Sequence, residues 1–196
     1  VAGSSVTGCI DWPRRFDHMQ QHTGQHLLSA VLGTLYEART VGFHLGAGSA
    51  TIDVDLSSLD PGDVARAERL ANEIAAENRP VTVSYEEAAQ AAGLRRASER
   101  EGVLRIVSIA DLDRSACGGT HVRATGEIGA LLIRRLEKVR GGLRIEFLCG
   151  GRAVARARKD FEALGAVARV FSSGLDEAPA LAAAQRAALE AADKAR

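Results

Sequence analysis

Two short segments, far apart in the chain, constrain most strongly what this sequence can fold into. The first, residues 22–26 (HTGQH), holds two histidines at positions i and i+4, which lie on one face of a helix. The second, residues 117–121 (CGGTH), holds a cysteine and a histidine at the same spacing, and its two glycines allow the backbone to bend sharply. Three imidazoles and one thiolate form a ligand set that suits tetrahedral Zn²⁺. We therefore expect a fold that brings both segments to one zinc ion, with the ligands His22, His26, Cys117 and His121.

Either pair alone is weak evidence for a metal. An H-x-x-x-H pattern is common and usually means two histidines with satisfied hydrogen bonds, and a single cysteine more often packs than ligates. The two pairs together account for three of the five histidines in the chain. Because their ligand types fit one metal, the combination predicts a zinc site.

The residues alone leave the chemistry of such a site open. Four protein ligands favour a closed, structural zinc, whereas a catalytic zinc usually keeps a position for water or substrate. An open zinc would hold a substrate amine or carbonyl, or lower the pKa of a bound water toward about 7. A metalloprotease helix needs a Glu between its two histidines, and here Thr23-Gly24-Gln25 stands there, which excludes that class.

Composition limits the class of protein and its compartment. The chain has 196 residues, 46% hydrophobic and 26% charged, as expected of a globular domain with an appendage. Its net charge of zero argues against binding nucleic acid by bulk charge alone. Three cysteines without disulfide-like spacing favour a reducing cytoplasm, and no apolar run reaches membrane-spanning length.

Hydrophobic periodicity predicts an α+β fold, with a mostly antiparallel sheet packed against helices and a C-terminal helical appendage. We expect the first helix to run from an N-cap at Asp17 to about Ala38, and Arg140-Gly141-Gly142 to turn a hairpin. These elements predict a zinc-containing domain over residues 1–151 and a helical segment over 152–196. The remaining elements are strands at 50–56, 81–85 and 103–109, and helices from Pro61 to before Pro80, at 86–92, at about 152–171 and at 176–195.

Four stretches resemble a known family. Residues 17–28 (DHMQQHTGQHLL) resemble the editing-domain signature of alanyl-tRNA synthetase and of its free-standing relatives, the AlaX-type alanyl-tRNA editing proteins. Residues 117–122 (CGGTHV) and 125–129 (TGEIG) are similar to the second zinc motif of this family, and residues 145–153 to its usual continuation. The resemblance covers roughly residues 6–153.

The resemblance implies a function that composition cannot show. Such proteins hydrolyse the ester that links a wrong amino acid, mainly serine and also glycine, to tRNA-Ala. This is a second sieve, needed because an alanine pocket cannot strongly reject small analogues. The resemblance implies the second-additional-domain fold of tRNA synthetases, and His22, His26, Cys117 and His121 as zinc ligands. It makes mischarged tRNA-Ala the partner, and 1–16 the remnant of the truncated N-terminal barrel that longer members carry.

Further site residues are predicted less directly. Gln25 would orient water or simply cap the helix, and Thr40 would contact the serine hydroxyl or simply begin a loop. Thr120 is a polar group beside the metal motif, and the amides of Gly118 and Gly119 would bind an oxyanion or serve only the turn.

Two other functions stay open, a non-catalytic tRNA-binding module with structural zinc and a threonyl-tRNA synthetase-type editing domain. The run Asp17-His18-Met19-Gln20-Gln21-His22 favours the alanyl type. The C-terminal helices leave a homo-oligomer open. A local basic surface either contacts phosphates or is a solvated face; it comprises Arg134, Arg135, Lys138, Arg140, Arg144, Arg152, Arg156, Arg158 and Lys159.

Overall fold

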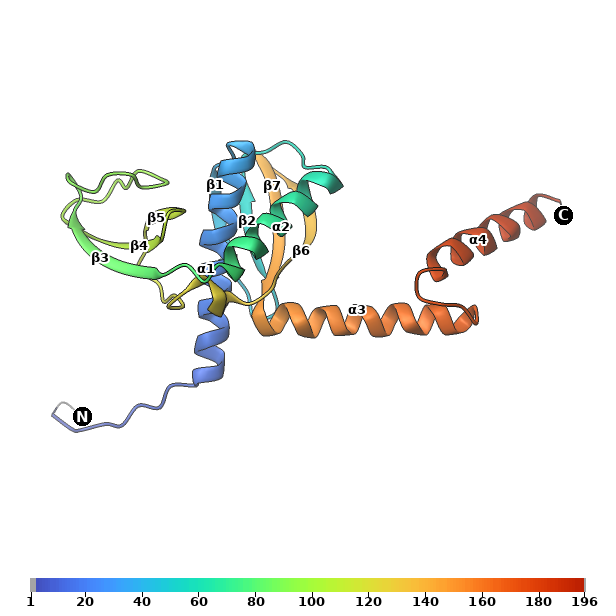
Figure 1. Ribbon diagram of the computed structural model, residues 1–196, viewed down its shortest axis with the longest axis horizontal. Helices are drawn as coiled ribbons and strands as arrows, with labels where there is room; N and C mark the ends of the chain where they lie inside the picture. The colour runs from blue at the N-terminus through green and yellow to red at the C-terminus, as the bar shows by residue number, and fades with distance from the viewer. Residues whose placement is uncertain (1–2, 196) are drawn as a thin grey trace. The chain divides into compact units, whose positions relative to one another are not determined.

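The computed structural model describes residues 3–195 and has the predicted α+β architecture (Figure 1). Val1, Ala2 and Arg196, which belong to the expected segments 1–16 and 152–196, lie outside the described residues. The elements follow in the order α1 (Trp12–Tyr36), β1 (Thr40–Leu45), β2 (Ala50–Val54), α2 (Pro61–Ala76), β3 (Val81–Glu87), β4 (Val103–Ile109), β5 (Asp113–Ala116), the 3-10 helix η1 (Thr125–Ile128), β6 (Leu131–Val139), β7 (Gly142–Cys149), α3 (Gly150–Val170) and α4 (Ala178–Lys194).

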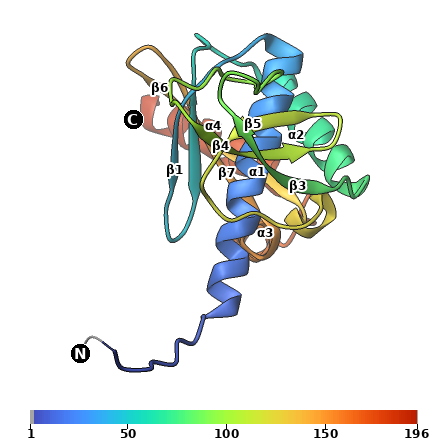
Figure 2. The same cartoon turned by 90° about the vertical axis from the view of Figure 1, so that its left-hand side faces the viewer.

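The strands of the described residues form two antiparallel sheets, one in the order β1-β2-β7-β6 and one in the order β3-β4-β5. The predicted hairpin joins β6 to β7, with Gly141 at a positive φ of 86° in its turn. Such a φ favours glycine because a side chain is strained there. α1 contacts β1, β2 and β7 of the first sheet and β5 of the second, so this one helix connects the two sheets (Figure 2).

The main core lies between α1 and the first sheet. Leu27, Leu28 and Leu32 of α1 are fully buried in one cluster with Ile145 and Phe147 of β7. Burying each of these side chains stabilises the fold by roughly 1.5–3 kcal/mol. The helix is therefore held rigidly against the sheet along the turns that follow the two histidines.

The first helix begins earlier than the sequence predicted. Asp11, not Asp17, is its N-cap, and the Asp11 side chain accepts a hydrogen bond from the Arg14 amide at 3.2 Å. Pro13 is compatible with this start because the first helical turn has free amides anyway. Asp17 instead pairs with Arg152 at 2.6 Å. The short helix predicted for 86–92 is also wrong, because β3 continues to Glu87 and irregular chain follows.

The described residues fall into two compact units, divided between Ala153 and Val154. The second unit consists of the rest of α3, a turn and α4, and Ala168 and Ala178 are its buried residues of note. It leaves Phe161, Val170 and Leu189 more than half exposed. Within residues 3–195, no helix has the length and apolar character needed to cross a membrane.

Candidate metal centre

The first pair of candidate ligands comes from the middle of α1. Gly24, which lies between His22 and His26, faces β7 so closely that a Cβ there would lie 2.2 Å from the Sγ of Cys149. Gln21 is fully buried; its Nε2 donates to the Cys149 carbonyl at 3.0 Å, and its Oε1 accepts from the Cys149 amide at 2.8 Å. These contacts fix the helix on β7 and thereby set where the two imidazoles project.

The second pair lies in the loop that follows β5. Arg105 of β4 donates from Nη1 to the carbonyl oxygens of Cys117 at 2.6 Å and of Gly119 at 2.9 Å, which holds the loop in its bend. A Cβ at Gly119 would lie 2.2 Å from Cε1 of His22, so the backbone approaches that imidazole as only glycine allows. The loop thus packs directly against the helix.

The structure brings the four predicted ligands together. Their ligand atoms all lie within 4.8 Å of one another, and this cluster could hold a metal ion. Cys117 Sγ lies 3.5 Å from His22 Nε2 and 3.4 Å from His121 Nε2. Tetrahedral Zn²⁺ with bonds of about 2.3 Å to sulfur and about 2.0–2.1 Å to nitrogen would separate these atoms by about 3.6 Å. The donor set and its spacing therefore fit zinc.

Hydrogen bonds on the far side of two imidazoles set their orientation. His26 Nδ1 lies 2.9 Å from Oδ2 of Asp113, a carboxylate with a fully buried side chain. His121 Nδ1 lies 3.1 Å from the hydroxyl of Thr23, which also accepts the Val122 amide. Both rings accordingly present Nε2 to the cluster, in the arrangement that holds metal-binding histidines in one tautomer.

The electrostatics favour a thiolate at the centre. Burial opposes the charge on Cys117, but hydrogen bonds from the three histidines and from the Gly119 amide lower the pKa of the thiol to about 3. Burial lowers the pKa of His121, and charge on the neighbouring imidazoles lowers it further. Together these effects exceed the opposing effect of the Cys117 thiolate, which raises the pKa. Burial also acts against protonation of His26, but Asp113 and Cys117 raise its pKa. A thiolate is the form of cysteine that binds metals.

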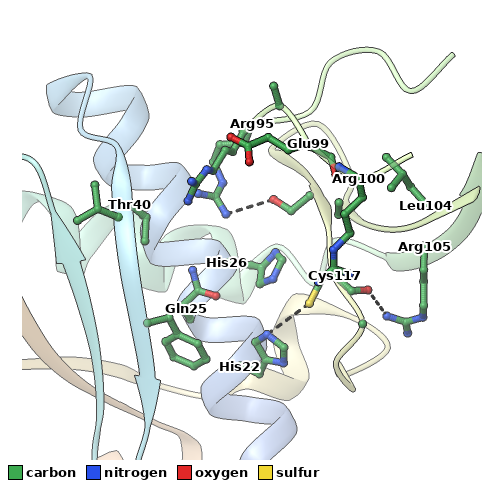
Figure 3. A pocket seen from close by; sticks show the side chains of 18 of the residues that line it. His22, Gln25, His26, Thr40, Arg95, Glu99, Arg100, Leu104, Arg105 and Cys117 are labelled. Carbon is green, nitrogen blue, oxygen red and sulfur yellow. Dashed lines mark hydrogen bonds between the residues drawn. The ribbon is translucent and has the colours of Figure 1, made fainter. Parts of the chain in front are cut away.

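A pocket of about 750 Å³ opens beside the cluster (Figure 3). His22, His26 and Cys117 lie in its wall, which Thr40 to Phe43 from β1 and Arg95 to Glu101 from the loop between β3 and β4 also line. Phe43 stacks on His22 at a ring distance of 5.5 Å. The candidate metal centre is therefore reachable from the pocket rather than enclosed.

Two of the further predicted residues meet in the pocket wall. Gln25 and Thr40 both line it, and both hydrogen-bond the buried hydroxyl of Ser29, Gln25 Nε2 at 2.9 Å and Thr40 Oγ1 at 2.7 Å. Figure 3 shows the Gln25 amide oxygen turned toward the side of the pocket where His26 and Cys117 lie. Ser29 itself had no signal in the sequence beyond its i+4 spacing from Gln25.

The glycines and Thr120 have different surroundings. Gly118 lines the pocket. The Gly119 amide donates a hydrogen bond to Cys117 Sγ at 3.4 Å, so in this structure it is engaged by the sulfur of the cluster. Thr120 is exposed and lies outside the pocket lining.

The basic surface predicted from the sequence is partly neutralised. Arg144 pairs with Asp53 at 2.7 Å, Arg152 with Asp17, and Arg156 with Asp160. The arginines that face the pocket, Arg95, Arg96, Arg100 and Arg105, were not singled out. Asp113, whose side chain contacts His26, was also missed, because its buried position on β5 depends on the tertiary fold.

Several known proteins are similar in sequence to this chain. Residues 104–146 match the family model described as the threonyl and alanyl tRNA synthetase second additional domain. Over 159 residues the chain is 38% identical to the alanyl-tRNA editing protein AlaX-L of Pyrococcus horikoshii, covering 79% of this chain and 39% of that protein. It is 37% identical to the alanine–tRNA ligase of Pyrococcus abyssi, covering 86% of this chain and 20% of the ligase. It is 31% identical to the alanyl-tRNA editing protein Aarsd1 of Danio rerio, covering 89% of this chain and 44% of that protein.

The α+β fold is of the tRNA synthetase second-additional-domain type, and residues 104–146 match the model of that domain. More narrowly, the chain is a homologue of the AlaX-type alanyl-tRNA editing proteins, and the resemblance inferred from its motifs is confirmed. The chain spans less than half the length of each of the three relatives above.

Proposed function

We propose that this chain is a zinc-dependent hydrolase that deacylates mischarged tRNA-Ala, removing serine and also glycine. The observation that carries the proposal is that the cluster of His22, His26, Cys117 and His121 borders a pocket of about 750 Å³, which a substrate can enter. The names of the relatives, alanyl-tRNA editing proteins and alanine–tRNA ligase, supply the substrate class.

The pocket suits the aminoacylated end of a tRNA. Small-molecule sites commonly measure about 300–1,000 Å³, a range that accommodates a terminal nucleoside with an esterified amino acid. Thr40 offers a hydroxyl in the pocket wall, positioned by Ser29 at 2.7 Å. The Thr40 hydroxyl would hydrogen-bond the hydroxyl of a bound serine. Alanine has no hydroxyl, so it cannot make this hydrogen bond.

The residues around the cluster would orient the reacting groups. When bound, zinc supplies a Lewis acid that polarises an ester carbonyl or a water molecule. Gln25, held by Ser29, would orient the attacking water through its amide oxygen. Gly118 leaves the pocket wall without a side chain, so the ester can approach the loop closely.

Deacylation assays test the proposal. Wild-type protein is expected to hydrolyse Ser-tRNA-Ala and Gly-tRNA-Ala and to spare Ala-tRNA-Ala, while Cys117→Ala loses most of this activity together with its zinc. Ser-tRNA-Thr tests the threonyl-type alternative, and its preference over Ser-tRNA-Ala would reassign the substrate. Zinc-loaded protein that binds tRNA-Ala without hydrolysing any ester would instead be a binding module. Hydrolysis that survives the loss of Cys117 would remove the metal from the mechanism.

A further inference from the structure

Two arginines that line the pocket also make hydrogen bonds to residues of the candidate metal centre or to their partners. Arg95 comes from the loop between β3 and β4, and Arg105 comes from β4. Arginines in a pocket proposed to take the end of a tRNA would ordinarily be assigned to phosphate binding. Their hydrogen bonds in this structure point to another role.

Arg95 reaches the metal cluster through a buried carboxylate. Its Nε donates to Asp113 Oδ1 at 2.7 Å, and its Nη2 donates to Ser115 Oγ at 3.1 Å. The other carboxylate oxygen, Asp113 Oδ2, lies 2.9 Å from Nδ1 of His26. The Asp113 side chain is fully buried, so without Arg95 it would keep a charge in the interior with less compensation.

A main-chain hydrogen bond of Arg95 also attaches the loop between β3 and β4 to β5. The Arg95 amide donates to the Arg114 carbonyl at 2.8 Å, which anchors the main chain of the loop beside β5. Ser115 donates to both oxygens of Asp113, at 3.2 and 3.0 Å, so the carboxylate is held from several sides. These hydrogen bonds restrict the orientation of the Asp113 carboxylate, which in turn restricts the orientation of the His26 imidazole.

Arg105 supports the other half of the cluster. Its Nη1 donates to the carbonyls of Cys117 and Gly119, and thus fixes the loop that carries the thiolate. Arg95 therefore reaches His26 through one intervening carboxylate, whereas Arg105 binds the main chain of Cys117 itself, as Figure 3 shows.

We propose that Arg95 and Arg105 are positioning residues of the metal centre, Arg95 acting on His26 through Asp113 and Arg105 acting on the Cys117 loop. This inference rests on the metal part of the proposed function. Hydrogen-bond partners behind metal ligands typically change metal affinity by about 10–100-fold. We expect a loss of that size in the zinc affinity of Arg95→Ala and of Arg105→Ala.

The experiment measures zinc affinity by competition with a chromophoric chelator, and the absorption spectrum of the Co²⁺-substituted protein. Arg95→Ala and Arg105→Ala should bind zinc about 10–100-fold more weakly and shift the Co²⁺ bands. Arg95→Lys and Arg105→Lys should recover part of the loss, because one ammonium replaces only part of a guanidinium's contacts. Arg96→Ala is the matched control, since Arg96 follows Arg95 in the same loop and lines the same pocket. Its zinc affinity should equal that of wild type.

Each result decides the matter. Wild-type zinc affinity and an unchanged Co²⁺ spectrum in folded Arg95→Ala and Arg105→Ala would overturn the proposal. Should an alanine variant fail to fold, its lysine variant carries the test, and wild-type affinity and spectrum there would have the same consequence. If the alanine variants instead weaken tRNA binding and reduce its salt dependence while keeping their zinc, the arginines bind phosphate.

Zinc binding and ester hydrolysis, measured together on wild type, distinguish failure of this inference from failure of the proposed function. Wild-type protein that binds zinc but hydrolyses no ester would end the proposed activity and leave the support role of the arginines intact. Wild-type protein that binds no zinc would end both.

Discussion

Gly119 is the single residue where the shape of the candidate centre is most tightly determined. A Cβ there would lie 2.2 Å from Cε1 of His22, whereas at Gly118 a Cβ meets nothing within 4 Å. Gly119→Ala must therefore displace either the His22 ring or the loop, and we expect its zinc affinity to fall at least about tenfold, while Gly118→Ala stays near wild type. Chelator competition on both variants measures this. Equal affinities of the two variants would show that the loop can shift without disturbing the ligands.

The ligands were predictable from spacing, and their supports were not. The i, i+4 pair and the glycine-bent pair reveal four metal-competent side chains, because ligand geometry depends on local structure. Asp113 and Arg95 act across the tertiary fold, on a strand and a loop whose contact no local pattern specifies. Thr40 was found only through the family resemblance, and Ser29, which joins Thr40 to Gln25, became visible only when β1 was placed beside α1.

At the scale of elements, the pairing of β2 with β7 carries an ion pair with a defined pH dependence. Asp53 lies opposite Arg144 in the register, and the hydrogen bond from Arg144 lowers the pKa of the Asp53 carboxyl. A lowered folded-state pKa stabilises the protein above the unfolded value of about 3.9, and this stabilisation is lost as the pH falls through the folded value. Both partners are partly exposed, so the pair is worth only about 0–1 kcal/mol.

Asp53→Asn should therefore lower the free energy of unfolding by at most about 1 kcal/mol at neutral pH, with the difference from wild type vanishing in acid below the folded pKa. Urea unfolding at both pH values measures it, and the double variant with Arg144→Gln gives the coupling between the two residues. A difference that persists unchanged in acid would assign the loss to packing rather than to charge.

The elements themselves were predictable in proportion to how locally they are specified. The β6–β7 hairpin follows from the glycines at 141 and 142, where β6 turns into β7, and α2 follows from Asp60, its observed N-cap, and Pro61, its first residue. The start of α1 was misplaced because Asp11 and Asp17 are both acceptable caps in isolation. The contact of Arg152 with Asp17, which involves residues far apart in the sequence, gives Asp17 a different role.

At the scale of the whole molecule, the question is how much of the fold depends on the metal. The hydrophobic core joins α1 to β2, β7 and α2 through residues such as Leu28, Ile52, Ala71 and Phe147, none of which is a candidate ligand. The cluster adds a link between α1 and the loop after β5. We therefore expect the first unit to stay folded when zinc is removed, but to be less stable.

The size of that loss follows from binding linkage. A ligand that binds only the folded state adds RT ln(1 + [L]/Kd), which is about 2.7 kcal/mol when free zinc is 100 times its Kd. Thermal or urea unfolding of wild type with zinc and with chelator should show this difference, and Cys117→Ala should show little of it because a ligand is missing. Near-UV circular dichroism reports whether the chelated protein keeps fixed tertiary packing. If that signal disappears with the metal, zinc organises the core itself, and the effects of Gly119 and Arg95 variants on affinity would have to be read as effects on folding.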